Sequence, residues 1–293
     1  MSRAAAPAHV LRLLGAGGAF SRRYGTTCAE LRLPNGERWL IDCGRQAPDQ
    51  IAAAGLRWHD ITGQIITHVH GDHVFGLEDF AFTRYFTDTD DVPSVRSGGP
   101  RIKLVCHGAV RAEVWQTMAP SLRYVPDPAA PASGTLATYF DPVEAVGHEP
   151  ARNNPWHHSE RFELPGLRVV MRETVHVPGK PSTSVELALD DAGTIAWWSG
   201  DSTVDAALLT ALEPRTTVFF HDCTFREYPG QVHGAFGALE QLPAAVRHKM
   251  VLMHHEDDLE QHRSRAEALG FRVALPGDCF DLARGLLLTG PSA

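Results

Sequence analysis

The chain has 293 residues, of which 43% are hydrophobic and 21% are charged, a composition typical of a globular protein with a sizeable core. The formal net charge is −8 at pH 7 and no run of lysine and arginine is present, so a large nucleic-acid partner is not expected. No stretch of about 18 apolar residues occurs, so we expect no membrane span.

Short apolar or alternating runs predict β-strands along most of the chain, at residues 9–15, 28–34, 38–44, 64–70, 102–108, 167–176, 183–189, 194–200, 217–223 and 250–256. Helical spacing predicts helices at 109–119, 202–213, 237–249 and 257–270. Residues 88–100 and 126–155 are rich in Pro, Gly, Ser and Asn, and we interpret them as surface loops. Candidate site residues lie on both sides of these loops. We therefore expect one α/β domain over residues 1–293, with sheets in the middle and helices outside.

The N-terminal segment and the cysteines bear on the cellular compartment. Arg12 interrupts the first apolar run and glycines follow it, which does not fit a secretion signal. The cysteines are odd in number, scattered and without a CxxC motif, a pattern typical of reduced thiols: Cys28, Cys43, Cys106, Cys223 and Cys279. We therefore expect a cytoplasmic protein.

The stretch ITHVHGDH places His68, His70, Asp72 and His73 within six positions. Imidazoles and carboxylates in mixed clusters suit zinc and its first-row neighbours. His68 and His70 alternate along the chain, so both can face one ion, while Asp72 and His73 can face a second. The motif predicts a metal site, with surface histidines in a loop as the alternative.

Further polar residues come directly after strand-like runs: His176, Asp201, and the neighbours His254 and His255. Strand ends at one rim of a sheet bring groups distant in sequence into one cleft. A structural histidine at 176 and a turn-forming aspartate at 201 are the alternatives to a shared site.

These motifs, together with residues 13–44, SGDST around Asp201 and VLMHH at 251–255, resemble the metallo-β-lactamase superfamily over roughly residues 10–282. The resemblance implies a four-layer αββα sandwich with a dinuclear metal site on its edge. It implies that His68, His70 and His176 hold one divalent ion, that Asp72, His73 and a late histidine hold the other, and that Asp201 bridges them. The sequence pattern that surrounds the last metal ligand in this family matches His254 better than His255. Zinc is the expected metal, with manganese or iron as alternatives.

Two segments resemble the ribonuclease Z-like branch, VFFHDCTF at 218–225 and GQVHGAFGALEQLP at 230–243. By position, the resemblance implies that Asp222 and His233 protonate the leaving oxygen; a strand-end aspartate and a helix-capping histidine are the alternative. The tRNA-clamping arm of that branch lies between the ligands matching His176 and Asp201. In this chain a strand, a turn and a second strand use all the residues between His176 and Asp201, which leaves no room for such an arm. We therefore do not expect tRNA processing.

The chain is most similar to small cyclic-nucleotide phosphodiesterases of the anti-Pycsar type, through GLEDFAFTRYF at 76–86, KMVLMHHED at 249–257 and PGDCFDL at 276–282. This resemblance implies a homodimer that hydrolyses a small anionic phosphodiester, above all a 3′,5′-cyclic nucleotide, with Asp72, Asp222 and His233 as catalytic residues. Carbonyl substrates need no proton donor at Asp222 and His233, which favours a phosphodiester. The alternatives are a ribonuclease Z-like nuclease, a lactonase or esterase, and a non-catalytic nucleotide-binding protein.

Some residues have weaker indications. Asp42 is a candidate to orient a metal-bound imidazole, or a strand-end turn former. Gly15-Ala-Gly-Gly lacks the spacing of a dinucleotide-binding loop, and we expect Cys223 to be packed rather than reactive. Four aromatic residues are expected to pack in the core, with a pocket roof or a subunit contact as the alternative: Phe80, Phe82, Tyr85 and Phe86. His157 and His158 are expected to be exposed in a loop, with a contact to a neighbouring subunit as the alternative.

Overall fold

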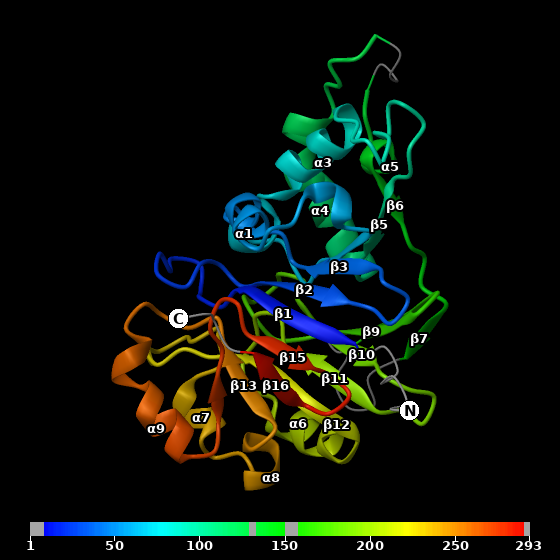
Figure 1. Cartoon of the computed structure of the whole chain (residues 1–293). Coiled ribbons are helices and arrows are strands. Elements are labelled where there is room, and N and C mark those ends of the chain that lie inside the picture. The colour runs from blue at the N-terminus through cyan, green and yellow to red at the C-terminus, as the bar shows by residue number, and fades with distance from the viewer. Residues whose placement is uncertain (1–8, 129–132, 150–157, 290–293) are drawn as a thin grey trace.

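The computed structural model describes residues 9–128, 133–149 and 158–289, which form two eight-stranded sheets packed face to face (Figure 1). The first sheet has the order β16-β15-β1-β2-β3-β4-β5-β6 and the second the order β14-β13-β12-β11-β10-β9-β8-β7. The strands of the first sheet are β1 (Val10–Gly15), β2 (Cys28–Arg32), β3 (Arg38–Ile41), β4 (Gly63–Ile65), β5 (Ile102–Val105), β6 (Phe140–Pro142), β15 (Cys279–Asp281) and β16 (Leu286–Thr289). Those of the second are β7 (Gly147–Glu149), β8 (Ser159–Leu164), β9 (Leu167–Glu173), β10 (Thr183–Ala188), β11 (Ile195–Trp198), β12 (Thr216–Asp222), β13 (Met250–Met253) and β14 (Arg272–Val273).

Helices cover the outer face of each sheet. Over the first sheet lie α1 (Ala47–Ala53), α2 (Gly71–Val74), α3 (Leu77–Phe86), α4 (Gly108–Leu122) and α5 (Leu136–Tyr139), with a 3₁₀ turn at Trp58–Asp60. Over the second lie α6 (Ala206–Leu212), α7 (Phe236–Leu239), α8 (Ala244–Arg247) and α9 (Arg263–Ala268), with 3₁₀ turns at Glu213–Arg215 and Leu259–Gln261. The arrangement is the expected four-layer αββα sandwich (Figure 1).

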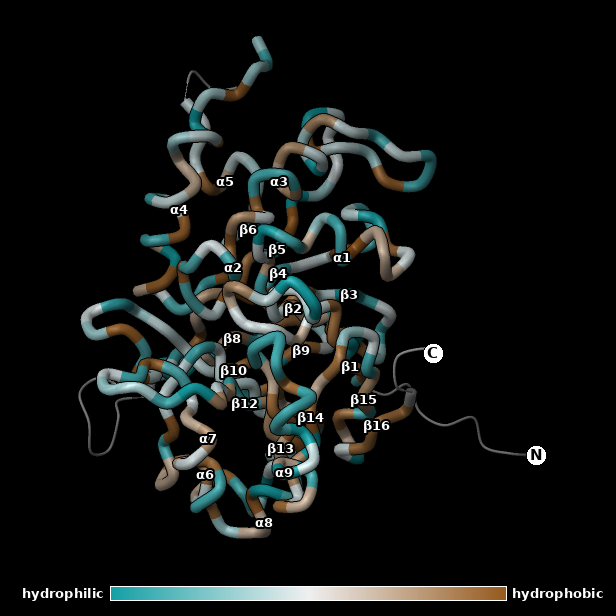
Figure 2. Tube along the Cα trace, turned by 90° about the vertical axis from the view of Figure 1, so that its left-hand side faces the viewer, coloured by the Kyte–Doolittle hydropathy of each residue, from teal (hydrophilic) through white to brown (hydrophobic). Residues whose placement is uncertain are grey.

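The continuous apolar runs follow from this layering. In β3, Trp39 and Ile41 belong to the cluster between the two sheets, whereas Leu40 packs under the helices. In β12, Phe220 faces the other sheet and Phe219 faces the helices. Successive side chains of a strand point to opposite faces, and both faces are covered, so both must be apolar. In Figure 2, hydrophobic segments recur along the strands, while many hydrophilic ones lie in outer loops.

All ten predicted runs overlap a strand, but several other expectations need correction. The predicted helix 237–249 is two short helices, because Pro243 lacks an N–H and stands at the N-cap of α8. The predicted helix 257–270 begins as a 3₁₀ turn after Asp258 and continues as α9; Gly270, at a φ of +92°, follows its end. The predicted loop 88–100 contains no helix or strand. The predicted loop 126–155 is wrong in part, because it contains α5, β6 and β7; its residues 129–132 and 150–155 lie outside the described residues.

The cysteines are free in the described structure, and Cys223 is fully buried under the helices of the second sheet. Burial raises the pKa of its thiol well above the ordinary value, as expected for a packed rather than a reactive cysteine. Within the described part of the chain, no helix is both long and apolar enough to cross a membrane.

Candidate metal centre

The HxHxDH motif runs from the end of a strand into a helical turn. β4 ends at Ile65, His70 has an extended backbone, and α2 then carries Asp72 and His73. His70 is the N-cap of α2, with φ −113° and ψ 158°. The change from extended to helical backbone directs the two pairs of side chains to different points.

The first cluster joins His68, His70, His176 and Asp201. His70 Nδ1 lies 3.1 Å from His68 Nε2 and 3.2 Å from His176 Nε2. Asp201 Oδ2 lies 3.7 Å from His68 Nε2 and 3.9 Å from His176 Nε2. His176 follows the end of β9 and Asp201 follows the end of β11, so strand ends deliver both residues as expected.

The second cluster joins Asp72, His73, Asp201 and His254. His73 Nε2 lies 3.3 Å from both Asp72 Oδ2 and Asp201 Oδ1. His254 Nε2 lies 3.3 Å from Asp72 Oδ2 and 3.4 Å from Asp201 Oδ2. The carboxylate of Asp201 therefore belongs to both clusters.

The donor atoms of these clusters fit divalent cations. A carbonyl can only accept, so His176 Nδ1 must donate to Val232 O at 2.9 Å, which leaves the lone pair of its Nε2 facing the first cluster. His73 Nε2 and Asp201 Oδ1 are buried 3.3 Å apart, and among the described residues neither makes a hydrogen bond of acceptable geometry. Unpaired buried polar atoms are costly, and a cation between them would satisfy both.

The charges around the two clusters also favour a bound cation. Burial lowers the pKa of His73, but the carboxylates of Asp201, Asp72 and Asp42 outweigh burial and hold that pKa well above its ordinary value, because positive charge is favoured at this point. Burial raises the pKa of Asp201, but the imidazoles of His254 and His73 outweigh it and hold the pKa well below the usual range. Burial, then the neighbouring His176, lowers the pKa of His70 to about 4. A neutral imidazole is the form that binds metal.

Asp42 positions His73 from the side opposite the cluster. Its Oδ2 accepts a hydrogen bond from His73 Nδ1 at 2.8 Å, and its Oδ1 accepts one from the Thr67 N–H at 2.8 Å. The same residue turns the chain directly after β3, with a φ of +61°. Asp42 therefore both orients the imidazole of His73 and forms the turn at the end of the strand.

The structure separates His254 from His255. His254 faces the cluster, whereas His255 Nε2 lies 2.9 Å from the carbonyl oxygen of Ala274, and its ring packs edge-on against Tyr24 at 4.8 Å. Only His254 is placed to share an ion with Asp72.

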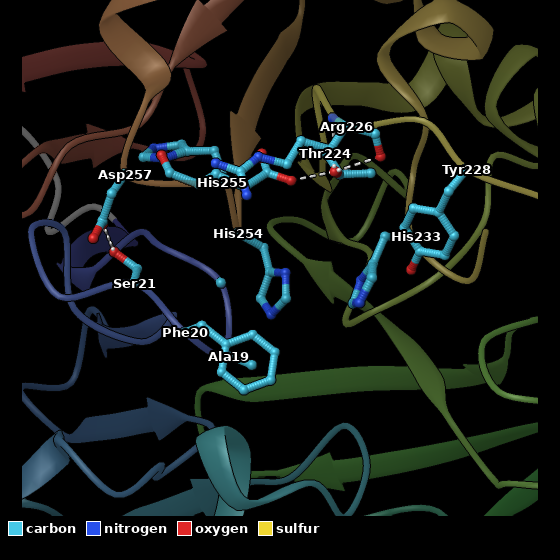
Figure 3. A pocket seen from close by; sticks show the side chains of 12 residues that line it. Ala19, Phe20, Ser21, Thr224, Arg226, Tyr228, His233, His254, His255 and Asp257 are labelled. Atoms are coloured by element: carbon cyan, nitrogen blue, oxygen red, sulfur yellow. Dashed lines mark hydrogen bonds between the residues drawn. The ribbon is translucent and has the colours of Figure 1, made fainter.

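Asp222 and His233 lie beside the second cluster. Asp222 ends β12 and is fully buried; its Oδ2 accepts from His233 Nδ1 at 2.8 Å and from the Ser202 N–H at 3.1 Å. Burial lowers the pKa of His233, but the charge of Asp222 outweighs burial and raises it, so the cation is favoured. The N-cap of α7 is Ala235, so His233 does not cap that helix. His233 and His254 instead line a cavity of about 430 Å³ (Figure 3).

The aromatic residues after the motif pack in the core, as expected. Phe80 and Tyr85 are buried, and Phe82 and Phe86 pack against the same cluster under the first helical layer. His158 is exposed, and His157 lies outside the described residues.

Sequence analysis missed Phe20 and Tyr228, which line the cavity. The glycine pair before Phe20 is the sequence feature that indicates a close approach of this loop to the site. A Cβ at Gly18 would lie 2.9 Å from the carbonyl oxygen of His254 and 3.3 Å from its ring, so only glycine allows the loop this close to the cluster.

Comparisons with known proteins agree with the fold. The short form of human tRNase Z superimposes with a TM-score of 0.65 at 19% identity, covering 93% of this chain and 99% of that one. The metallo-β-lactamase-fold protein YhfI from Bacillus subtilis does so with a TM-score of 0.64 at 12% identity, with the same coverage of both chains. Fold and site define a protein of the metallo-β-lactamase fold with side chains that could hold metal ions.

Sequence comparison identifies the family. The Anti-Pycsar protein Apyc1 family matches residues 9–274, and the chain belongs to this family. Apyc1 of Paenibacillus xerothermodurans is 32% identical over 266 residues, covering 89% of this chain and 93% of the relative. Apyc1 of Bacillus phage 010DV004 is 30% identical over 280 residues, covering 93% and 98%.

Proposed function

We propose that the protein is a dinuclear-metal phosphodiesterase that hydrolyses small phosphodiesters, chiefly 3′,5′-cyclic nucleotides. The observation that carries the proposal is the Asp222–His233 pair: it adjoins the candidate metal clusters, and His233 lines a cavity of about 430 Å³. A cavity of this size suits a small ligand. Membership of the anti-Pycsar family supports a cyclic nucleotide as that ligand.

His68, His70, His176 and Asp201 would hold one divalent ion, and Asp72, His73, His254 and Asp201 would hold the other. Nitrogen and oxygen donors of this kind favour zinc, with manganese or iron as alternatives. Ions bound there would supply Lewis acidity, which lowers the pKa of water and offsets the charge of the phosphoryl group.

The chain's own groups handle the protons. Asp222 accepts the Nδ1–H of His233 and keeps the ring cationic and oriented, so that Nε2 can donate its proton to the departing ribose oxygen. General acid catalysis of this kind raises the reaction rate by about 10²- to 10⁴-fold. Asp72 would serve as a metal ligand, and its carboxylate could also accept a hydrogen bond from the attacking water. No protein nucleophile is needed for this scheme.

The proposal extends to the organisation of the chain. The end of β4 supplies residues from the first sheet, and the ends of β9, β11, β12 and β13 supply the rest from the second, which supports one domain over residues 1–293. We further propose a cytoplasmic homodimer without a large nucleic-acid or a membrane partner. Analytical ultracentrifugation would test the dimer.

A substrate panel with and without chelator tests the activity. It would contain purine and pyrimidine 3′,5′- and 2′,3′-cyclic monophosphates, cyclic dinucleotides and lactones, with products separated by chromatography. We expect linear nucleoside monophosphates from the 3′,5′-cyclic substrates only when metal is present. A protein that contains two metals but leaves every diester intact would be a nucleotide-binding protein, and lactone hydrolysis alone would indicate acyl chemistry.

A further inference from the structure

We propose that Phe20 is a stacking platform for the nucleobase and supplies part of the affinity for the substrate. This inference rests on the proposed function and names the part of the site that holds the substrate away from the reacting phosphate. Phe20 is 89% exposed, yet it lines the same cavity as His233 and His254 (Figure 3).

The loop that carries Phe20 lies against the metal cluster. Gly18, two residues earlier, packs on the imidazole and carbonyl of His254. The backbone N–H of Gly18 also donates to the carbonyl oxygen of His255 at 2.9 Å. A ligand whose phosphate reaches His254 would therefore bring its other end close to Phe20.

The loop is held in place on both sides of Phe20. The carboxylate of Asp257 accepts hydrogen bonds from Ser21 Oγ at 2.5 Å, from the Arg22 N–H at 2.9 Å and from the Arg23 N–H at 3.1 Å. On the other side, the Arg45 guanidinium donates to the carbonyl oxygen of Ala19. Anchoring of this kind reduces the ordering cost that a ligand would otherwise meet.

Packing does not account for Phe20. It belongs to none of the three apolar clusters of the described residues, so its exposed ring contributes little to the core. An aromatic face held at the edge of a small-molecule cavity is the group on which a nucleobase stacks. In Figure 3, Phe20 lies on the His254 side of the cavity and Tyr228 on the His233 side.

Several polar side chains of the cavity wall are engaged with neighbouring side chains. Thr224 Oγ1 donates to Glu256, Arg226 donates to Asp258 at 2.9 Å, and Ser21 is bonded to Asp257. Reading the edge of a base requires free donors and acceptors, whereas every base offers a face for stacking. Stacking on Phe20 therefore requires no free donor or acceptor on the cavity wall.

The test compares KM values for purine and pyrimidine 3′,5′-cyclic monophosphates and for the base-free 1-O-methylriboside 3′,5′-cyclic phosphate. In Phe20→Leu we expect KM to rise roughly five- to 150-fold for all nucleotides, which corresponds to the loss of one base stack. Turnover should change little, because the contact is the same in the ground and transition states. The base-free substrate should show no change, and Phe20→Trp should restore low KM values.

Tyr124→Ala is the matched control, because Tyr124 is 73% exposed and is not among the residues that line this cavity. Calorimetric binding of nucleoside 3′,5′-cyclic phosphorothioates gives a readout that does not depend on turnover. Unchanged binding and KM in Phe20→Leu, or an equal loss with the base-free substrate, would overturn the inference. If the native protein binds the phosphorothioates through Phe20 but hydrolyses no diester, the proposed function fails while the stacking role stands.

Discussion

Replacing Asp42 with asparagine changes one buried carboxylate into an amide of the same shape. Asparagine tolerates the φ of +61° at this position, and its oxygen can still accept from the Thr67 N–H. The amide nitrogen, however, would face His73 Nδ1, where two donors would meet. His73 would then move its proton to Nε2, the atom that faces Asp72 and Asp201.

The size of the effect follows from the lost contact. The His73–Asp42 hydrogen bond is 2.8 Å long and fully buried, and bonds to charged groups contribute about 1.5–3 kcal/mol. Partners that orient metal ligands contribute about 10- to 100-fold in metal affinity, which is about 1.4–2.7 kcal/mol. The two estimates overlap, so we expect Asp42→Asn to weaken metal binding by about 10- to 100-fold.

Competition with a chelator of known affinity, followed by elemental analysis, measures this change. Near-ultraviolet circular dichroism verifies that the variant keeps its tertiary packing. Asp90→Asn, at an exposed position, is the matched control. Native-like metal affinity in Asp42→Asn would refute the argument that Asp42 sets the proton position of His73.

Three further predictions concern other parts of the molecule. His233→Ala should lower turnover of cyclic nucleotides by about 10²- to 10⁴-fold, with metal content unchanged; bis(p-nitrophenyl) phosphate, whose leaving group needs no proton, should be much less affected, and loss of metal would make His233 a ligand. His254→Ala should lose metal in elemental analysis, whereas His255→Ala should keep it; the reverse result would exchange their assignments. Phe220→Ala removes a ring packed 5.1 Å from Phe280 between the sheets, and should lower the free energy of unfolding in urea by about 3–5 kcal/mol; a loss below 1 kcal/mol would contradict tight packing there.

Much of the fold was predictable from local pattern. The central strands are covered on both faces, so their runs of apolar residues stand out in the sequence. The strands that were missed lie at or next to the ends of the two sheets: β6, β7, β8, β14, β15 and β16. In β8, for example, charged Glu160, Arg161 and Glu163 surround the one fully buried apolar residue, Phe162, and this pattern gives little signal.

Within the site, the sequence alone determined which donors are available and how the HxHxDH motif divides between two points. That division is local, because it depends on a few consecutive backbone angles from His68 to His73. The tertiary structure decided which of two adjacent histidines faces the cluster, that His233 meets Asp222 rather than capping α7, and that Phe20 lines the cavity. Each of these depends on how the ends of separate strands and the loop before β2 are stacked against one another, and no single stretch of residues encodes that arrangement.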